Sequence, residues 1–173
     1  MTKLIPIVDP DVLHQRISHI AAVISADYKG RELVVVGVLK GAFIFVADLV
    51  RLLTLEKIGI DFLQASSYGT DTVSSEAIIL KKDIDIDIHG KDVLLVDDIV
   101  DTGLTLAFLV NHLKGFKPRD IRVCALIDNK SRRKTEVQVD YVCMEIQEGF
   151  LVGYGLDYAE RYRNLPGIYH MRQ

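Results

Sequence analysis

Two short apolar runs without a single charged residue constrain the fold of this chain most strongly. They are Leu33–Leu39 (LVVVGVL) and residues 93–96 (VLLV). Uncharged runs rich in β-branched residues are typical of strands buried on both faces of a parallel sheet. Each run precedes a segment with apolar residues at helical spacing, which predicts helices over residues 42–55 and about 104–113. Strands that alternate with helices predict an α/β fold with a mainly parallel sheet and helices on both faces.

The rest of the chain fits the same architecture. Helical spacing of apolar residues, with Asp9 as the cap and Pro10 in the first turn, predicts a helix over residues 10–28. Residues 66–76 (SSYGTDTVSSE) are polar and have no helical period, which predicts a flexible loop. A chain of 173 residues suits one domain over residues 1–173. Further strands are expected at residues 58–65, 78–80, 84–88, 121–127 and 139–144.

Charge and composition argue against several classes of protein. A formal net charge of −3 gives no general attraction to nucleic acid, and no apolar stretch is long enough to cross a membrane. Cys124 and Cys143 lie in strand-like runs, where cysteine behaves as a small buried hydrophobe, so we expect a reducing, cytoplasmic location. One basic run is interpreted as a solvated loop, and it contains Lys130, Arg132, Arg133 and Lys134.

The strongest candidate site is the acidic segment between the strand at residues 93–96 and the following helix. The amides of a helix N-terminus attract phosphate, glycine allows close approach of the backbone, and threonine hydroxyls add donors. Carboxylates would repel a bare phosphate, but they accept hydrogen bonds from sugar hydroxyls or bind magnesium. A phosphorylated sugar therefore suits the segment; the simpler alternative is that Asp98 or Asp101 only caps the helix. The residues concerned are Asp97, Asp98, Asp101, Thr102, Gly103 and Thr105.

Residues 93–106 (VLLVDDIVDTGLTL) resemble the phosphoribosyl-pyrophosphate motif of type I phosphoribosyltransferases. LKGA at residues 39–42, SY at 67–68 and FLVGYGLDY at 150–158 are similar to the hypoxanthine-guanine branch of that family. The resemblance implies a parallel sheet flanked by helices, a small hood built from the terminal segments and a flexible active-site loop. It also implies a purine salvage enzyme that transfers 5-phosphoribosyl from phosphoribosyl pyrophosphate to hypoxanthine or guanine, giving IMP or GMP and pyrophosphate, with Mg²⁺ as cofactor and a homodimer or homotetramer as the assembly.

The same resemblance implies a role for each matching residue. Asp101 is the expected general base, and Ser67 and Tyr68 belong to the flexible loop. A cis peptide before the lysine is expected in the pyrophosphate-binding set, which is Leu39, Lys40, Gly41 and Arg163. Ribose and its 5-phosphate are expected to contact Asp97, Asp98, Val100, Thr102, Gly103, Leu104 and Thr105. The expected magnesium ligands are Asp157, Asp97 and Asp98.

The purine site is where the sequence departs from the family. Phe150 matches the aromatic residue that stacks on the base, and Leu151 matches the residue whose backbone reads the base edge. Asn129 stands where the family has a lysine that donates to the 6-oxo group, and Lys130 follows it, so either residue is a candidate donor. A xanthine-preferring or broad 6-oxopurine transferase therefore remains an alternative, as does a regulator that senses phosphoribosyl pyrophosphate and binds nucleic acid.

Overall fold

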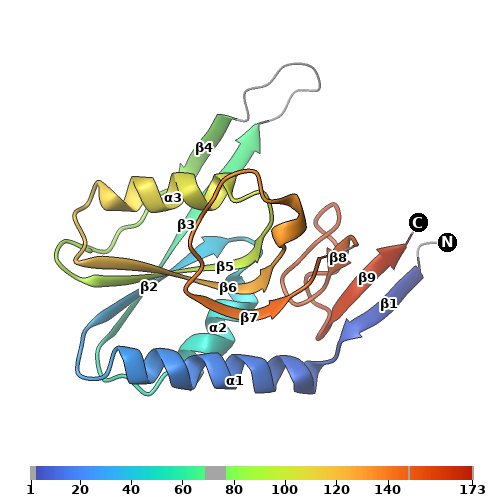
Figure 1. The fold of residues 1–173 in the computed structure, drawn as a ribbon, viewed down its shortest axis with the longest axis horizontal. Helices are drawn as coiled ribbons and strands as arrows, with labels where there is room; N and C mark the ends of the chain where they lie inside the picture. The colour runs from blue at the N-terminus through green and yellow to red at the C-terminus, as the bar shows by residue number, and fades with distance from the viewer. Residues whose placement is uncertain (1–2, 69–76, 148, 173) are drawn as a thin grey trace.

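The computed structural model describes residues 3–68, 77–147 and 149–172, and its centre is a six-stranded sheet (Figure 1). The strand order is β4-β3-β2-β5-β6-β7, and every neighbouring pair is parallel except β3 and β4. The expected mainly parallel α/β sheet is thereby confirmed. The strands are β2 (Leu33–Leu39), β3 (Ile58–Tyr68), β4 (Ala77–Lys82), β5 (Asp92–Val100), β6 (Asp120–Asp128) and β7 (Tyr141–Glu145).

Helices cover both faces of this sheet, because its central strands are apolar on both sides. The helices α1 (Pro10–Asp27) and α2 (Phe43–Leu52) bury their apolar side chains against one face. The helix α3 (Leu104–Lys114) does the same on the opposite face. All residues of β2 before Leu39 are buried, as expected for a strand between two helical layers. Among the described residues, no helix combines the length and apolar character that crossing a bilayer requires.

The terminal segments form a second, three-stranded sheet, which confirms the expected hood. Its order is β1-β9-β8, with bounds Lys3–Val8, Ile168–Arg172 and Leu151–Val152, and all pairings are antiparallel. Figure 1 shows β1 and β9 side by side in this sheet. The sequence reasoning did not predict β1, and Pro6 explains why, since proline in a strand interior argues against a strand. Here the pairing is irregular between Pro6 and Val8, which accommodates the proline.

Three expected elements differ in the structure. Residues 84–88 are not a strand, because the amides of Asp85 and Ile86 donate to the carboxylate of Asp61 at 2.6 and 2.9 Å instead of to a neighbouring strand. Ser67 and Tyr68 were expected in a loop, but their backbones pair with Ile78 and Ala77 at the end of β3. The rest of the expected loop, residues 69–76, lies outside the described residues. The helix expected over residues 42–55 is shorter, spanning Phe43–Leu52.

Candidate active site at the carboxyl edge of the sheet

The segment between β5 and α3 forms a cradle at the edge where the parallel strands end. Gly103 is the N-cap of α3 and has a left-handed φ of 82°, and a Cβ there would lie 2.4 Å from the Thr135 carbonyl oxygen. Only glycine fits such a position. Gly103, and not Asp98 or Asp101, holds the N-cap position, so the alternative that one of these acids serves only as the helix cap is wrong; the hydroxyl of Thr102 accepts from the Leu104 amide at 3.4 Å. The amide ends of the first turn of α3 therefore suit an anion.

The segment that follows β6 braces this cradle from behind. The amides of Lys134 and Thr135 donate to the carbonyl oxygen of Thr102 at 2.9 and 3.0 Å. The guanidinium of Arg133 donates to the carbonyl oxygen of Asp101 at 3.1 Å and forms an ion pair with the buried carboxylate of Asp128. The expectation of a solvated basic loop is therefore wrong for Arg133, whose side chain is only 17% exposed.

Two more basic side chains of this run, those of Arg132 and Lys130, also find acidic partners. Arg132 lies in a short 3-10 helix, Lys130–Arg132, and its Nη1 is 2.8 Å from Oδ2 of Asp101. Lys130 is exposed and pairs with Glu145 at 2.5 Å. Sequence reasoning missed these contacts, because no local pattern distinguishes a paired arginine from a solvated one.

Two adjacent acids, Asp97 and Asp98, lie at the centre of the edge, in the last part of β5. Burial and the neighbouring Asp98 carboxylate raise the pKa of Asp97 well above its usual range. Burial also raises the pKa of Asp98, against the weaker opposing effect of Arg163. Two carboxylates that share a buried position hold a proton more readily than isolated ones. The pair therefore suits a ligand that brings hydroxyl donors or positive charge.

The turn after β2 lies directly against this acidic pair. The peptide bond between Leu39 and Lys40 is cis, as the family resemblance implied. A Cβ on Gly41 would lie 1.8 Å from Oδ2 of Asp98, so the backbone of the turn touches the carboxylate. On its other side, a Cβ on Gly155 would lie 2.0 Å from the carbonyl oxygen of Gly41. The segment between β8 and β9, residues 153–167, is called the hood segment below. The two glycines therefore allow the hood segment, the turn after β2 and Asp98 to meet.

A small network of charges in the hood segment lies next to this turn. Nη2 of Arg163 is 2.8 Å from Oδ1 of Asp157 and 3.5 Å from Oε2 of Glu160, and Nζ of Lys40 is 3.0 Å from the same Glu160 oxygen. Arg163 also donates to the carbonyl oxygen of Gly155 at 2.7 Å. The two cations expected to bind pyrophosphate are thus brought together. Glu160, which joins them, was not expected from the sequence.

The residues expected at a purine site come from the hood and from the end of β6. Phe150 is 49% exposed, and its ring meets that of Tyr158 edge-on with centroids 5.6 Å apart. Leu151 lies in β8, opposite His170. Asn129 is buried, and its backbone N–H donates to the Val100 carbonyl oxygen at 2.9 Å. The side-chain Oδ1 of Asn129 accepts from the Ser131 hydroxyl at 2.6 Å. An exposed aromatic ring therefore lies in the hood, and a fixed carboxamide lies beside the cradle.

The acidic residues of the site fit a magnesium ion that is bound partly by the protein and partly by the substrate. Within the described ranges, no group of three or more His, Cys, Asp or Glu side chains is arranged to hold a metal. Asp157 is already paired with Arg163, whereas burial raises the pKa values of Asp97 and Asp98. Magnesium usually keeps several waters and binds one or two carboxylates together with substrate phosphates. This donor set fits that mode of binding and does not fit an all-protein cage.

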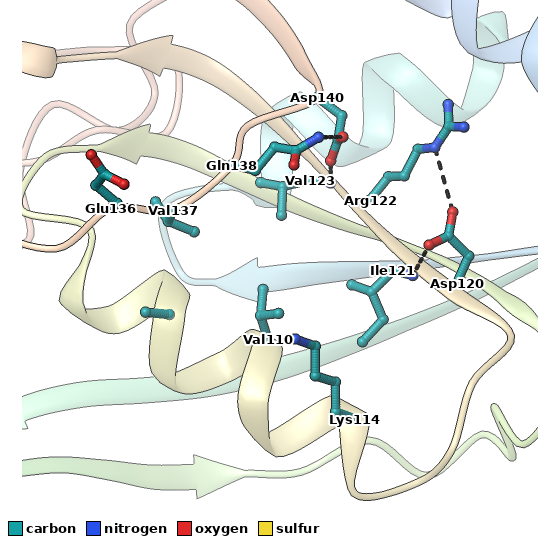
Figure 2. A pocket seen from close by; sticks show the side chains of 11 residues that line it. Val110, Lys114, Asp120, Ile121, Arg122, Val123, Glu136, Val137, Gln138 and Asp140 are labelled. Carbon is teal, nitrogen blue, oxygen red and sulfur yellow. Dashed lines mark hydrogen bonds and ion pairs between the residues drawn. The ribbon is translucent and has the colours of Figure 1, made fainter.

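A cavity of about 610 Å³ lies elsewhere, between α3 and β6 (Figure 2). Its lining is mixed, and its apolar residues include Val110, Ile121 and Val123. Its polar groups largely satisfy one another, since Asp140 accepts from the Val123 amide at 2.8 Å and from Gln138 at 2.7 Å. None of the residues expected at the site lines this cavity, so its volume does not make it the candidate site.

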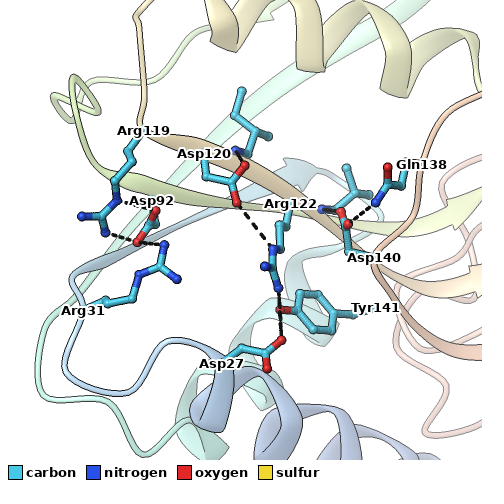
Figure 3. Close-up of polar contacts among 11 residues, drawn as sticks. Asp27, Arg31, Asp92, Arg119, Asp120, Arg122, Gln138, Asp140 and Tyr141 are labelled. Carbon is cyan, nitrogen blue, oxygen red and sulfur yellow. Dashed lines mark hydrogen bonds and ion pairs between the residues drawn. The ribbon is translucent and has the colours of Figure 1, made fainter.

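The amino edge of the sheet holds a different charge network, centred on the fully buried Asp92 (Figure 3). Arg31 lies 2.7 Å from its carboxylate, and Arg119 donates to both carboxylate oxygens. Although burial opposes it, hydrogen bonds from these arginines hold the pKa of Asp92 below its usual range. The network joins the turns that precede β2 and β6 to the start of β5, so its role is structural.

We expect Asp92→Asn to lower the free energy of unfolding by about 3 kcal/mol at pH 7, because two guanidinium groups lose their buried partner. A carboxylate with a depressed folded pKa stabilises the fold above its unfolded pKa of about 3.9 and loses that effect as the pH falls through the folded value. The difference between variant and parent should therefore shrink below about pH 4. Urea unfolding at pH 7 and pH 3 measures it. The control is Asp120→Asn, since Asp120 is 46% exposed and 3.5 Å from Arg122; an equal loss in both variants contradicts the prediction.

Comparisons with known proteins agree with this arrangement. A family model described as phosphoribosyl transferase domain matches residues 10–159. The chain is 46% identical over 168 residues to the hypoxanthine-guanine phosphoribosyltransferase of Aquifex aeolicus, covering 96% of this chain and 94% of that protein. It is 45% identical over 159 residues to the hypoxanthine phosphoribosyltransferase of Haemophilus influenzae, covering 90% and 88%. A crystal structure of a hypoxanthine-guanine phosphoribosyltransferase from Bacillus anthracis superposes with a TM-score of 0.92 at 40% identity, covering 99% of this chain and all of that one.

Proposed function

The chain belongs to the phosphoribosyltransferase family, in its hypoxanthine-guanine branch, and we propose that it performs purine salvage at the carboxyl edge of its sheet. The reaction transfers 5-phosphoribosyl from phosphoribosyl pyrophosphate to hypoxanthine or guanine and gives IMP or GMP with pyrophosphate. The observation that carries this assignment is the adjacent pair Asp97 and Asp98, whose pKa values burial raises, beside the N-terminus of α3, where the N-cap is Gly103. A ligand with both a phosphate and vicinal hydroxyls satisfies the two features together.

The cradle explains how the sugar phosphate would be held. The 5-phosphate accepts from the backbone amides and hydroxyls of residues 100–105, and the ribose hydroxyls donate to Asp97 and Asp98. Lys40, the backbone at Leu39 and Gly41, and Arg163 bind the pyrophosphate group on the other side of the acids. The anomeric carbon is thereby held between the leaving group and the base. Because the two reactants are already oriented, part of the entropic barrier is removed before reaction.

The chemical step breaks one bond and forms one bond at the anomeric carbon. The bond to the pyrophosphate oxygen breaks with its electron pair leaving on pyrophosphate, and a purine imidazole nitrogen bonds to the opposite face with inversion. Asp101 accepts the proton that this nitrogen loses. The backbone of Asp101 is held by Arg133 and its carboxylate by Arg132, so the base has a defined position.

We assign Asp97 and Asp98 as the side chains that would hold magnesium with phosphoribosyl pyrophosphate. When bound, the ion offsets the negative charge that develops on the departing pyrophosphate. Asp157 was also expected as a ligand, and its ion pair with Arg163 would have to open for that role. The carboxylate pair is therefore the stronger of the two candidate sets.

The purine is proposed to stack on the exposed ring of Phe150 and to meet the backbone of Leu151 at its edge. The Asn129 carboxamide supplies a donor for the 6-oxo group, since its oxygen already accepts from Ser131. Lys130 is the other candidate donor, but it would first have to leave Glu145. An amide donor in place of a lysine favours a second candidate function, transfer to xanthine or to all three 6-oxopurines.

The test is a turnover assay with phosphoribosyl pyrophosphate, magnesium and each of hypoxanthine, guanine, xanthine and adenine. We expect product with hypoxanthine and guanine and none with adenine, which lacks the 6-oxo group. A higher kcat/KM with xanthine than with the other two bases would select the second candidate. Absence of product with every base would contradict transferase activity.

Three further expectations stay predictions. They are the single domain over residues 1–173, the homodimer or homotetramer, and the cytoplasmic location. Equilibrium sedimentation would decide the oligomeric state.

The alternative of a regulator that binds nucleic acid loses its main support, because Lys130, Arg132 and Arg133 pair with acids of the chain itself.

A further inference from the structure

One acidic side chain of the hood, Glu160, contacts both cations of the proposed pyrophosphate subsite. Its Oε2 lies 3.0 Å from Nζ of Lys40, which is 120 positions away in the sequence, and 3.5 Å from Nη2 of Arg163. On the basis of the proposed function, we propose that Glu160 competes with pyrophosphate for these two cations and so sets the affinity of the subsite. The same competition acts on the substrate as it binds and on the product as it leaves.

The backbone holds Glu160 in a position from which its side chain reaches both cations. Its amide N–H donates to Oδ2 of Asp157 at 2.8 Å, and its φ of 63° lies in the left-handed region. Ala159 before it has a φ of 49°, also left-handed. Non-glycine residues in this region persist only where their surroundings hold them, and they are concentrated at ligand clamps. The carboxylate is thus kept beside the subsite by the turn that carries it.

The contact is open enough for a ligand to replace it. The side chains of Glu160 and Lys40 are 64% and 54% exposed, and exposed ion pairs are weak. An exposed glutamate is ionised at neutral pH, so Glu160 brings a negative charge to the two cations. Pyrophosphate brings several negative charges to the same cations and therefore displaces Glu160. The nearby negative charge then opposes tight retention of the product.

Substitution of Glu160 by its neutral isostere tests this role. In Glu160→Gln we expect the Kd of inorganic pyrophosphate, measured by titration calorimetry at a fixed magnesium concentration, to fall about three- to tenfold. The KM for phosphoribosyl pyrophosphate should fall in the same direction, while the KM for hypoxanthine stays unchanged. Glu160→Ala should give the same sign, because it also removes the charge.

The matched control is Glu32→Gln. Glu32 is 3.1 Å from Lys91 and 47% exposed, so the control removes the same charge from a similar ion pair at the opposite edge of the sheet. Unchanged or weaker pyrophosphate binding in both Glu160 variants overturns the inference, as does equal tightening in Glu32→Gln. Thermal unfolding verifies that each variant is folded. If the parent protein turns over substrate and Glu160→Gln binds pyrophosphate with the parent's Kd, only the inference about Glu160 is contradicted. If the parent protein shows no turnover, the proposed function itself is contradicted.

Discussion

Asp101→Asn is expected to lower kcat about 100-fold or more, with the KM values for both substrates changed less than about threefold. Asparagine keeps the size and the hydrogen-bonding reach of the side chain, but it does not accept the proton that the purine nitrogen loses. Proton transfer by a positioned side chain contributes about 10²- to 10⁴-fold to a rate. Steady-state kinetics with hypoxanthine at saturating phosphoribosyl pyrophosphate measures the effect.

The control for this variant is Arg132→Gln. The carboxylate of Asp101 pairs with Arg132 at 2.8 Å, so Asp101→Asn removes an ion pair as well as a base. Arg132 is 68% exposed, and its substitution removes the same pair while leaving the carboxylate in place. We expect kcat to fall less than about fivefold in Arg132→Gln, since exposed ion pairs are weak. Equal losses in the two variants, or an Asp101→Asn enzyme within threefold of the parent, would contradict the assignment of Asp101 as the base.

Local patterns in the sequence were enough to predict most of the fold. The uncharged run of β2 and the helical spacing of α1 are signals carried by neighbouring residues, and the structure has both elements within one residue of the expected bounds. The failures occurred where a distant group decides the structure. The alternating isoleucines of residues 84–88 resemble a strand, but the carboxylate of Asp61 takes the amides that a strand would need.

The candidate site shows the same division. The acids and glycines of the cradle were found because they lie together in one strand-to-helix segment. Glu160 and Arg133 were missed as contributors because their partners, Lys40 and the Asp101 carbonyl group, lie 120 and 32 positions away. Sequence spacing carries no information about such contacts unless a family pattern supplies it. A charged side chain that contacts the site from a distant part of the sequence is therefore recognised only in the structure.

Gly41→Ala is expected to lower kcat/KM for phosphoribosyl pyrophosphate about 100-fold or more. A displacement of a reacting group by about 1 Å already lowers a rate by about this factor. The new Cβ would lie 1.8 Å from Oδ2 and 2.5 Å from Cγ of Asp98. The carboxylate has little freedom to retreat, since its Oδ1 accepts from the Ile99 amide at 2.9 Å. Either Asp98 moves away from the ribose site, or the turn moves away from the pyrophosphate site.

Neither movement leaves the two halves of the substrate site in register. The backbone of Gly155 opposes a movement of the turn away from Asp98, because the Gly41 carbonyl oxygen already lies 2.0 Å from the position that a Cβ of Gly155 would take. Gly115→Ala is the matched control, since it adds one methyl group at the other end of α3, at a φ of −59° and 3.1 Å from the His112 carbonyl oxygen. Kinetics at varied phosphoribosyl pyrophosphate, with thermal unfolding of both variants, separates lost binding from lost folding. Parent-like kcat/KM in a folded Gly41→Ala protein would contradict the close contact between the turn and Asp98 on which the proposed substrate site depends.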